Sequence, residues 1–185
     1  MDEEKKREKM IAGKLREEER HTTMMTGFIR ENVYEFLITK KGYREEDIEV
    51  DAPFEVFSPT TGQNEPCSLD FIVRIGERRI VAIRCALTAL ESIERHVLAF
   101  SRVTGGIPIS VVTSSDYSRV LKTETGELVS EDLSSIPDRS EAIIMAGNFS
   151  PLEISEERLR MERRILLAFN TLNCRLPGAC GDGGC

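Results

Sequence analysis

The sequence contains no tryptophan, only 6% aromatic residues and no long apolar run. Its uninterrupted apolar stretches, such as residues 80–83, are far shorter than the roughly 20 residues that a membrane-spanning helix needs. The N-terminus reads Met-Asp-Glu-Glu-Lys-Lys-Arg-Glu-Lys, and the apolar segment of a secretion signal does not follow it. We therefore expect a cytoplasmic protein with no membrane partner.

Basic residues are fewer than acidic ones: the chain has 25 Lys and Arg residues and 32 Asp and Glu residues, which gives a net charge of −7. The molecule as a whole should not attract phosphate backbones, so any contact with nucleic acid requires a local basic patch. Hydrophobic residues make up 40% of the chain, which is enough to form a core and excludes wholesale disorder. A length of 185 residues suits one compact domain.

The five cysteines do not suggest a disulfide framework, since their number is odd and no secretion signal is evident. Cys67 and Cys85 lie in strand-like apolar runs, where a reduced cysteine behaves as a small hydrophobe. Cys174, Cys180 and Cys185 lie in a Gly-rich tail, and a zinc site there would lack its fourth ligand. A plain thiol-bearing tail is favoured, and a metal or redox module remains an alternative.

Hydrophobic periodicity divides the chain into four segments. They are a charged N-terminal helix or arm (1–25), an α/β core (26–150), an amphipathic C-terminal helix (151–173) and the Gly/Cys tail (174–185). In the arm, only Met10, Ile11 and Leu15 form an apolar stripe among seven acidic and seven basic residues, which favours a solvated helix.

Within the core, the spacing of apolar and turn-forming residues predicts the order helix, three strands, helix, strand. The predicted elements are a helix over 26–41, a strand over 48–57, a turn-rich stretch over 58–66, hairpin strands over 67–75 and 79–87, a helix over 88–104, and strands over 107–113 and 119–123. Pro53 places the first strand at a sheet edge or a bulge, and Thr88 with Glu91 forms a capping box for the second helix. Residues 128–155 remain ambiguous. The predicted class is α/β (α+β), with a central mixed β-sheet flanked by helices.

Four motifs within residues 28–129 carry a resemblance to a known family. They are the Lys-Gly-Tyr that ends the first helix, the SLDFIV run over 68–73, the RIVAIRCA run over 79–86 and the ISVVTS run over 109–114. Together they resemble the N-terminal domain of the type I restriction enzyme R subunit, in the PD-(D/E)XK nuclease superfamily. The resemblance implies a restriction-endonuclease-like core.

The same resemblance implies a metal-dependent cleavage site, and this chain departs from it. In the family, two carboxylates hold Mg²⁺ and a nearby lysine helps to activate the attacking water. Asp70 matches the first carboxylate, whereas Arg84 and Ala86 stand where the second carboxylate and the lysine belong. An arginine stays cationic and an alanine has no functional group, so the resemblance implies a damaged site in which Asp70 forms an ion pair with Arg84.

Further positions of the family's pocket also differ. A Gln-x-x-x-Tyr pair on the second helix is replaced by His96 and Phe100, and Glu31 or Glu35 supplies the remaining acid. We expect His96 to be an ordinary, partly exposed residue. The remnant site then comprises Glu31, Asp70, Arg84, Glu94 and His96.

The favoured function is therefore a non-catalytic restriction-endonuclease-like domain that acts as a nucleic-acid-associated binding or regulatory module without a cofactor. An active Mg²⁺-dependent endonuclease is the enzyme alternative, with its second carboxylate moved to Glu91 or Glu94. Whether the partner is nucleic acid or protein, and whether the chain forms a homo-oligomer, stays open. The candidate nucleic-acid contacts are Arg78, Arg79, Arg84, Arg95 and Arg102.

Overall fold

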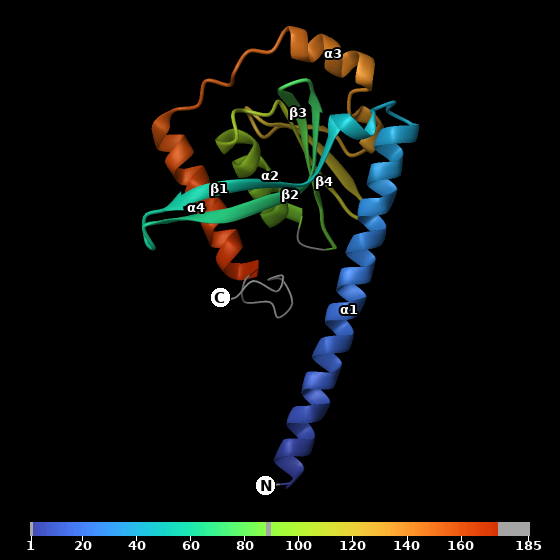
Figure 1. The fold of residues 1–185 in the computed structure, drawn as a ribbon, viewed down its shortest axis with the longest axis vertical. Helices are drawn as coiled ribbons and strands as arrows, with labels where there is room; N and C mark the ends of the chain where they lie inside the picture. Colours follow the sequence, from blue (N-terminus) through green and yellow to red (C-terminus); the bar gives the residue numbers. More distant parts are fainter. Residues whose placement is uncertain (1, 88–89, 174–185) are drawn as a thin grey trace.

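The computed structural model describes residues 2–87 and 90–173, which form six strands, four α-helices and two short 3₁₀ helices (Figure 1). Their order is α1 (Asp2–Thr39), η1 (Glu45–Asp47), β1 (Ile48–Ser58), β2 (Gln63–Ile75), β3 (Arg78–Cys85), α2 (Leu90–Val103), β4 (Ile109–Thr113), β5 (Ser118–Lys122), β6 (Leu128–Ser130), η2 (Leu133–Ser135), α3 (Arg139–Gly147) and α4 (Glu156–Asn173). The predicted N-cap Thr88 and the cysteines of the tail lie outside the described residues.

All six strands form one sheet in the order β1-β2-β3-β4-β5-β6. The β3–β4 pair is parallel and the other four pairs are antiparallel, so the sheet is mixed. Helix α2 makes the crossover that a parallel pair requires. The predicted class, a central mixed sheet flanked by helices, is confirmed, and β1 lies at the sheet edge as Pro53 predicts.

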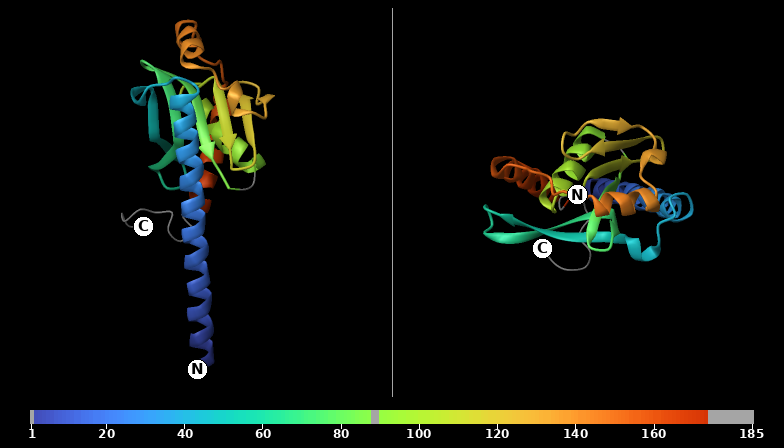
Figure 2. Two further views of the ribbon diagram at one scale, coloured as in Figure 1. Left: turned by 90° about the vertical axis from the view of Figure 1, so that its right-hand side faces the viewer. Right: turned by 90° about the horizontal axis from the view of Figure 1, so that it is seen from above.

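The two faces of the sheet bury different side chains, because successive residues of a strand point to opposite faces. Helices α1 and α3 share one hydrophobic cluster with the sheet, and α2 and α4 share the other, so each face is covered (Figure 2). The α1 and α3 side buries Phe71, Val73, Val81, Ile83 and Val111; the α2 and α4 side buries Ile72, Ala82, Val97, Phe100, Val112 and Leu166.

Helix α1 is continuous over 38 residues, so the expected boundary between residues 25 and 26 falls inside a single helix. Its C-terminal half packs on the sheet through Ile29, Val33 and Leu37, which recur at helical spacing. The N-terminal half projects beyond the rest of the fold, where Ile11 and Leu15 are exposed (Figures 1 and 2). The predicted arm is thus a helix.

Two stretches differ from the sequence prediction. The turn-rich residues 58–66 are mostly strand, since β2 begins at Gln63 and pairs with β1 down to Ser58, leaving a turn over 59–62. Cross-strand pairing there outweighs the turn preference of the single residues. The ambiguous stretch 128–155 contains β6 and α3, and α3 starts with a capping box between Asp138 and Glu141.

Among the described residues, no helix combines the length and the apolar character needed to cross a membrane.

Two adjacent glycines in the loop between α2 and β4 should lose different amounts of stability when each is replaced by alanine. Gly106 has φ +76°, and a Cβ there would lie 3.0 Å from the Leu152 Cβ and 3.1 Å from the Leu152 N. Gly105 has φ +99° but open space around it. Gly106→Ala should cost about 3 kcal/mol of unfolding free energy, from backbone strain plus overpacking, and Gly105→Ala only about 1.5 kcal/mol from strain. Urea denaturation measures both losses, and equal losses would contradict the close approach of Leu152.

Candidate functional site

Asp70 lies in β2 and is 5% exposed, with three donors around its carboxylate. The Cys85 backbone N–H donates to Oδ2 at 2.8 Å, and Nη1 of Arg84 lies 3.6 Å from the same oxygen. Nη1 of Arg30, from α1, lies 3.1 Å from Oδ1. The predicted ion pair between Asp70 and Arg84 is confirmed, and a second arginine joins it.

Arg30 is the residue of this site that sequence reasoning missed. Its guanidinium connects two carboxylates, because Nη2 lies 2.7 Å from Oδ1 of Asp51 while Nη1 contacts Asp70. It also lies over the Phe71 ring, 5.5 Å from the centroid. Burial alone lowers the pKa of Arg30, but the hydrogen bond to Asp51 and the charges of Asp70 and Asp51 outweigh burial and raise it. Arg30 is therefore a permanent cation between two acids.

The other acids of the expected site do not join Asp70. Glu31 and Glu91 are exposed, and Glu94 forms an ion pair with Arg119 of β5, with 2.8 Å between Oε1 and Nε. That pair lacks hydrogen-bond alignment, so the contact is ionic. Within residues 2–87 and 90–173, no three His, Cys, Asp or Glu side chains gather as metal ligands. The migrated-carboxylate alternative gains no support.

The thiol beside the site is not a ready nucleophile or ligand. Burial raises the pKa of Cys85, and the negative charge of Asp70 raises it further, against smaller opposite effects of Arg30 and Arg84. The thiol therefore stays protonated at neutral pH, whereas both nucleophilic attack and metal binding require a thiolate. Ala86, which the resemblance aligns with a lysine, is buried, and its backbone N–H donates to the Thr113 carbonyl.

His96 is 3% exposed, so the expectation of partial exposure is wrong. Helix α4 covers this part of α2, and the Phe169 ring lies 4.9 Å from the imidazole, centroid to centroid. Burial lowers the pKa of His96 to about 3, and the positive charge of Arg84 contributes. The imidazole is therefore neutral at physiological pH. The local sequence around Arg95 and His96 is polar and predicts exposure. The burial of His96 depends on α4, which begins 60 residues later in the chain.

Most of the candidate nucleic-acid-binding arginines have intramolecular partners. Arg79 makes two hydrogen bonds to the Glu49 carboxylate, at 2.7 and 3.2 Å, and Arg84 faces Asp70. Arg78 is exposed and its guanidinium lies 4.9 Å from the centroid of the Phe149 ring. Arg95 is exposed. The surface therefore offers Arg78 and Arg95 to an outside ligand more readily than the other three.

Arg102 is buried and belongs to a second ionic cluster, between α2 and α4. Glu162 of α4 is 1% exposed, and its Oε1 accepts hydrogen bonds from Nη1 of Arg102 at 2.8 Å and from Nε of Arg158 at 2.6 Å. Arg102 also donates to the backbone carbonyls of Thr123 and Glu124. Arg102 is therefore unavailable as a surface contact, and it joins α2 to α4 and to the end of β5.

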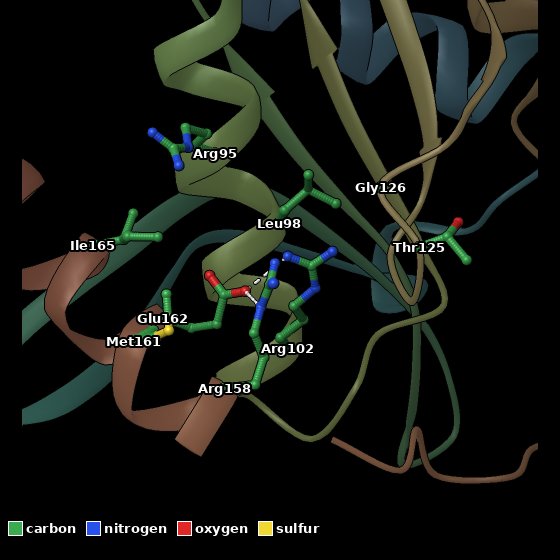
Figure 3. A pocket seen from close by; sticks show the side chains of 9 residues that line it. All are labelled: Arg95, Leu98, Arg102, Thr125, Gly126, Arg158, Met161, Glu162 and Ile165. Atoms are coloured by element: carbon green, nitrogen blue, oxygen red, sulfur yellow. Dashed lines mark hydrogen bonds and ion pairs between the residues drawn. The ribbon is translucent and has the colours of Figure 1, made fainter. Parts of the chain in front are cut away.

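A pocket of about 210 Å³ opens beside this cluster, between α2, α4 and the turn at residues 125–126 (Figure 3). Arginines from both helices line it together with the apolar side chains of Leu98, Met161 and Ile165.

Compared with protein-family models, curated proteins and solved structures, the chain matches none. The resemblance to a restriction-enzyme domain therefore stays a prediction from sequence, and the geometry described above carries the functional argument.

The buried imidazole predicts an acid-sensitive stability. In the unfolded chain a histidine binds a proton below pH 6.5, whereas native His96 does so only near pH 3. The unfolded state thus binds more protons in this window, and stability falls as the pH falls. His96→Phe should remove this contribution, which amounts to about 1.5 kcal/mol between pH 6.5 and 5.

Urea denaturation at several pH values measures this effect, and His21→Phe is the matched control because His21 is exposed. The control should follow the wild-type pH dependence. A His96→Phe variant that loses stability with acid as steeply as wild type would show that His96 does not stay neutral in the native state.

Proposed function

We propose that this chain is a non-catalytic, restriction-endonuclease-like domain that works in the cytoplasm as a nucleic-acid-associated binding or regulatory module. The observation that carries the proposal is the state of Asp70, whose carboxylate faces the guanidinium groups of Arg30 and Arg84. The acid that would hold a catalytic metal in an active relative instead balances two permanent positive charges.

Electrostatics explains why these cations oppose metal binding. With an effective dielectric constant of about 20, a divalent cation about 4 Å from one guanidinium is repelled by about 8 kcal/mol. Arginine does not deprotonate to relieve this repulsion. The position of the second carboxylate is itself Arg84, and the position of the lysine is Ala86, so neither a second ligand nor a base offsets the cost. These features support a site that does not cleave nucleic acid.

The nucleic-acid part of the proposal rests on exposed cations and is correspondingly modest. Arg78 and Arg95 remain exposed, whereas the net charge of the whole chain is −7. Two phosphate contacts predict association that weakens about tenfold between 50 and 200 mM salt. A protein partner is the outcome that remains if no such association exists.

Plasmid binding and cleavage can be measured together. Wild-type protein with Mg²⁺ or Mn²⁺ should retard supercoiled plasmid in a native gel at 50 mM salt and should leave it supercoiled, and Asp70→Ala should also produce no nicks. Nicking by wild type that disappears in Asp70→Ala would overturn the non-catalytic proposal in favour of the endonuclease. Absence of retardation at 50 mM salt would reject association with nucleic acid.

The role of Asp70 as a structural acid has its own test. Asp70→Asn keeps an acceptor for the Cys85 N–H but leaves the two arginines without their buried counter-charge, which should cost about 2–3 kcal/mol of unfolding free energy. Asp51→Asn is the matched control, because the Asp51 side chain is 65% exposed and should cost about 0.5 kcal/mol or less. A metal-ligating acid would behave in the opposite way, since its removal relieves strain in a functional site. A stabilised Asp70→Asn variant would therefore contradict the structural role.

A further inference from the structure

The pocket between α2 and α4 carries an excess of positive charge. Arg95 and Arg102 come from α2 and Arg158 from α4, while the only carboxylate that lines the pocket is that of Glu162 (Figure 3). Three guanidinium groups against one carboxylate leave a local charge of +2. Such an excess in a confined space favours an anion.

The two helices present these groups on matching faces. Arg95, Leu98 and Arg102 are three and four residues apart on α2, and Arg158, Glu162 and Ile165 are similarly spaced on α4. Residues at these spacings lie on one side of a helix. The facing sides of α2 and α4 therefore build the pocket, and the turn at residues 125–126 closes one end of it.

The hydrogen bonds around Glu162 determine which guanidinium groups can still bind a ligand. Arg102 donates hydrogen bonds through Nε to the Thr123 carbonyl, through Nη1 to the Glu162 carboxylate and through Nη2 to the Glu124 carbonyl. Arg158 donates to Glu162 through Nε, and its side chain is 52% exposed, so its guanidinium is reachable from solvent. Glu162 thus orients Arg158 and is itself shielded by two arginines.

We propose that this pocket binds a phosphate group of a small molecule, with Arg158 and Arg95 as the ligand-contacting cations and Arg102 as a positioning residue. Guanidinium groups pair with phosphate oxygens in a bidentate manner, and a charge of +2 matches a phosphate dianion. The apolar side chains of Leu98, Met161 and Ile165 lie beside these groups and suit the organic part of a phosphate monoester. The site involves neither Asp70 nor metal, but it shares Arg95 with the nucleic-acid contacts proposed above.

A purely structural role for the cluster makes a different prediction. If Glu162 and its arginines only fix α4 to α2, then Arg95, which makes no hydrogen bond or ion pair within the described residues, should be irrelevant to any ligand. If the pocket binds phosphate, Arg95 should matter for affinity although its removal leaves stability unchanged.

Isothermal titration calorimetry of the full chain in metal-free buffer tests the proposal with three probes. Adenosine monophosphate should bind saturably, inorganic phosphate should bind more weakly, and adenosine should give no signal. Arg95→Ala and Arg158→Ala should each weaken adenosine monophosphate at least tenfold. Arg164→Ala is the matched control, because Arg164 is an exposed arginine of α4 that does not line the pocket, and it should change affinity less than twofold.

Thermal melting of each variant, monitored by circular dichroism, guards against loss of fold, and Arg95→Ala keeps the test valid if Arg158→Ala is unstable. Phosphate binding equal to that of the nucleotide would identify a free-phosphate site instead of a monoester site. Absence of saturable binding up to 5 mM for both phosphate probes would overturn the proposal. An Arg164→Ala loss equal to that of Arg95→Ala would do the same, because it would show non-specific charge attraction.

Discussion

The structure depends on how the buried carboxylate of Asp70, in β2, is neutralised. A charged acid that is 5% exposed is tolerated only with counter-charges and hydrogen bonds around it. Asp70 obtains them from α1 through Arg30, from β3 through Arg84 and from the Cys85 backbone. These charges therefore join the long first helix to strands β2 and β3. The same contacts use the carboxylate oxygens that a catalytic metal would need.

A second buried acid, Glu162 of α4, meets the same constraint with a different result. Glu162 is more deeply buried than Asp70 and is likewise bonded to two arginines, one from its own helix and one from α2. At Asp70 both cations are directed at the acid. At Glu162, Arg158 reaches the acid through Nε alone and stays half exposed beside a pocket. The two buried acids therefore differ in what they leave accessible. The cations around Asp70 occupy its carboxylate, whereas Arg158 uses only Nε to contact Glu162.

Local patterns in the sequence were sufficient to predict contacts between the paired strands of a hairpin. The β2–β3 hairpin follows from alternation and a short turn, and its register already places Asp70 beside Arg84. The ion pair between Arg30 and Asp51 could not be predicted from the sequence. It joins a helix to a strand residue with φ +48°, and no periodic pattern of residues indicates such a contact. The burial of His96 depends on α4, a contact of high sequence separation. The capping box of α3 was readable from Asp138 and Glu141, whereas the strand pairing of residues 63–66 overrides their turn chemistry.

The proposed absence of a metal site would not follow from one substitution, because Arg30 of α1, Arg84 of β3 and the buried Ala86 all contribute to it. Replacing Arg84 by an acid would still leave Arg30 between Asp51 and Asp70, since that guanidinium comes from α1 and is held by both carboxylates and by the Phe71 ring. A lysine at Ala86 would have to be placed in a buried position next to β4. Removing Arg30 in turn would free two acids but would take away a contact that fixes α1 to the sheet. Because the cations that would repel a metal are also the counter-charges of Asp70, building a metal site here would require a new counter-charge for Asp70 at the same time.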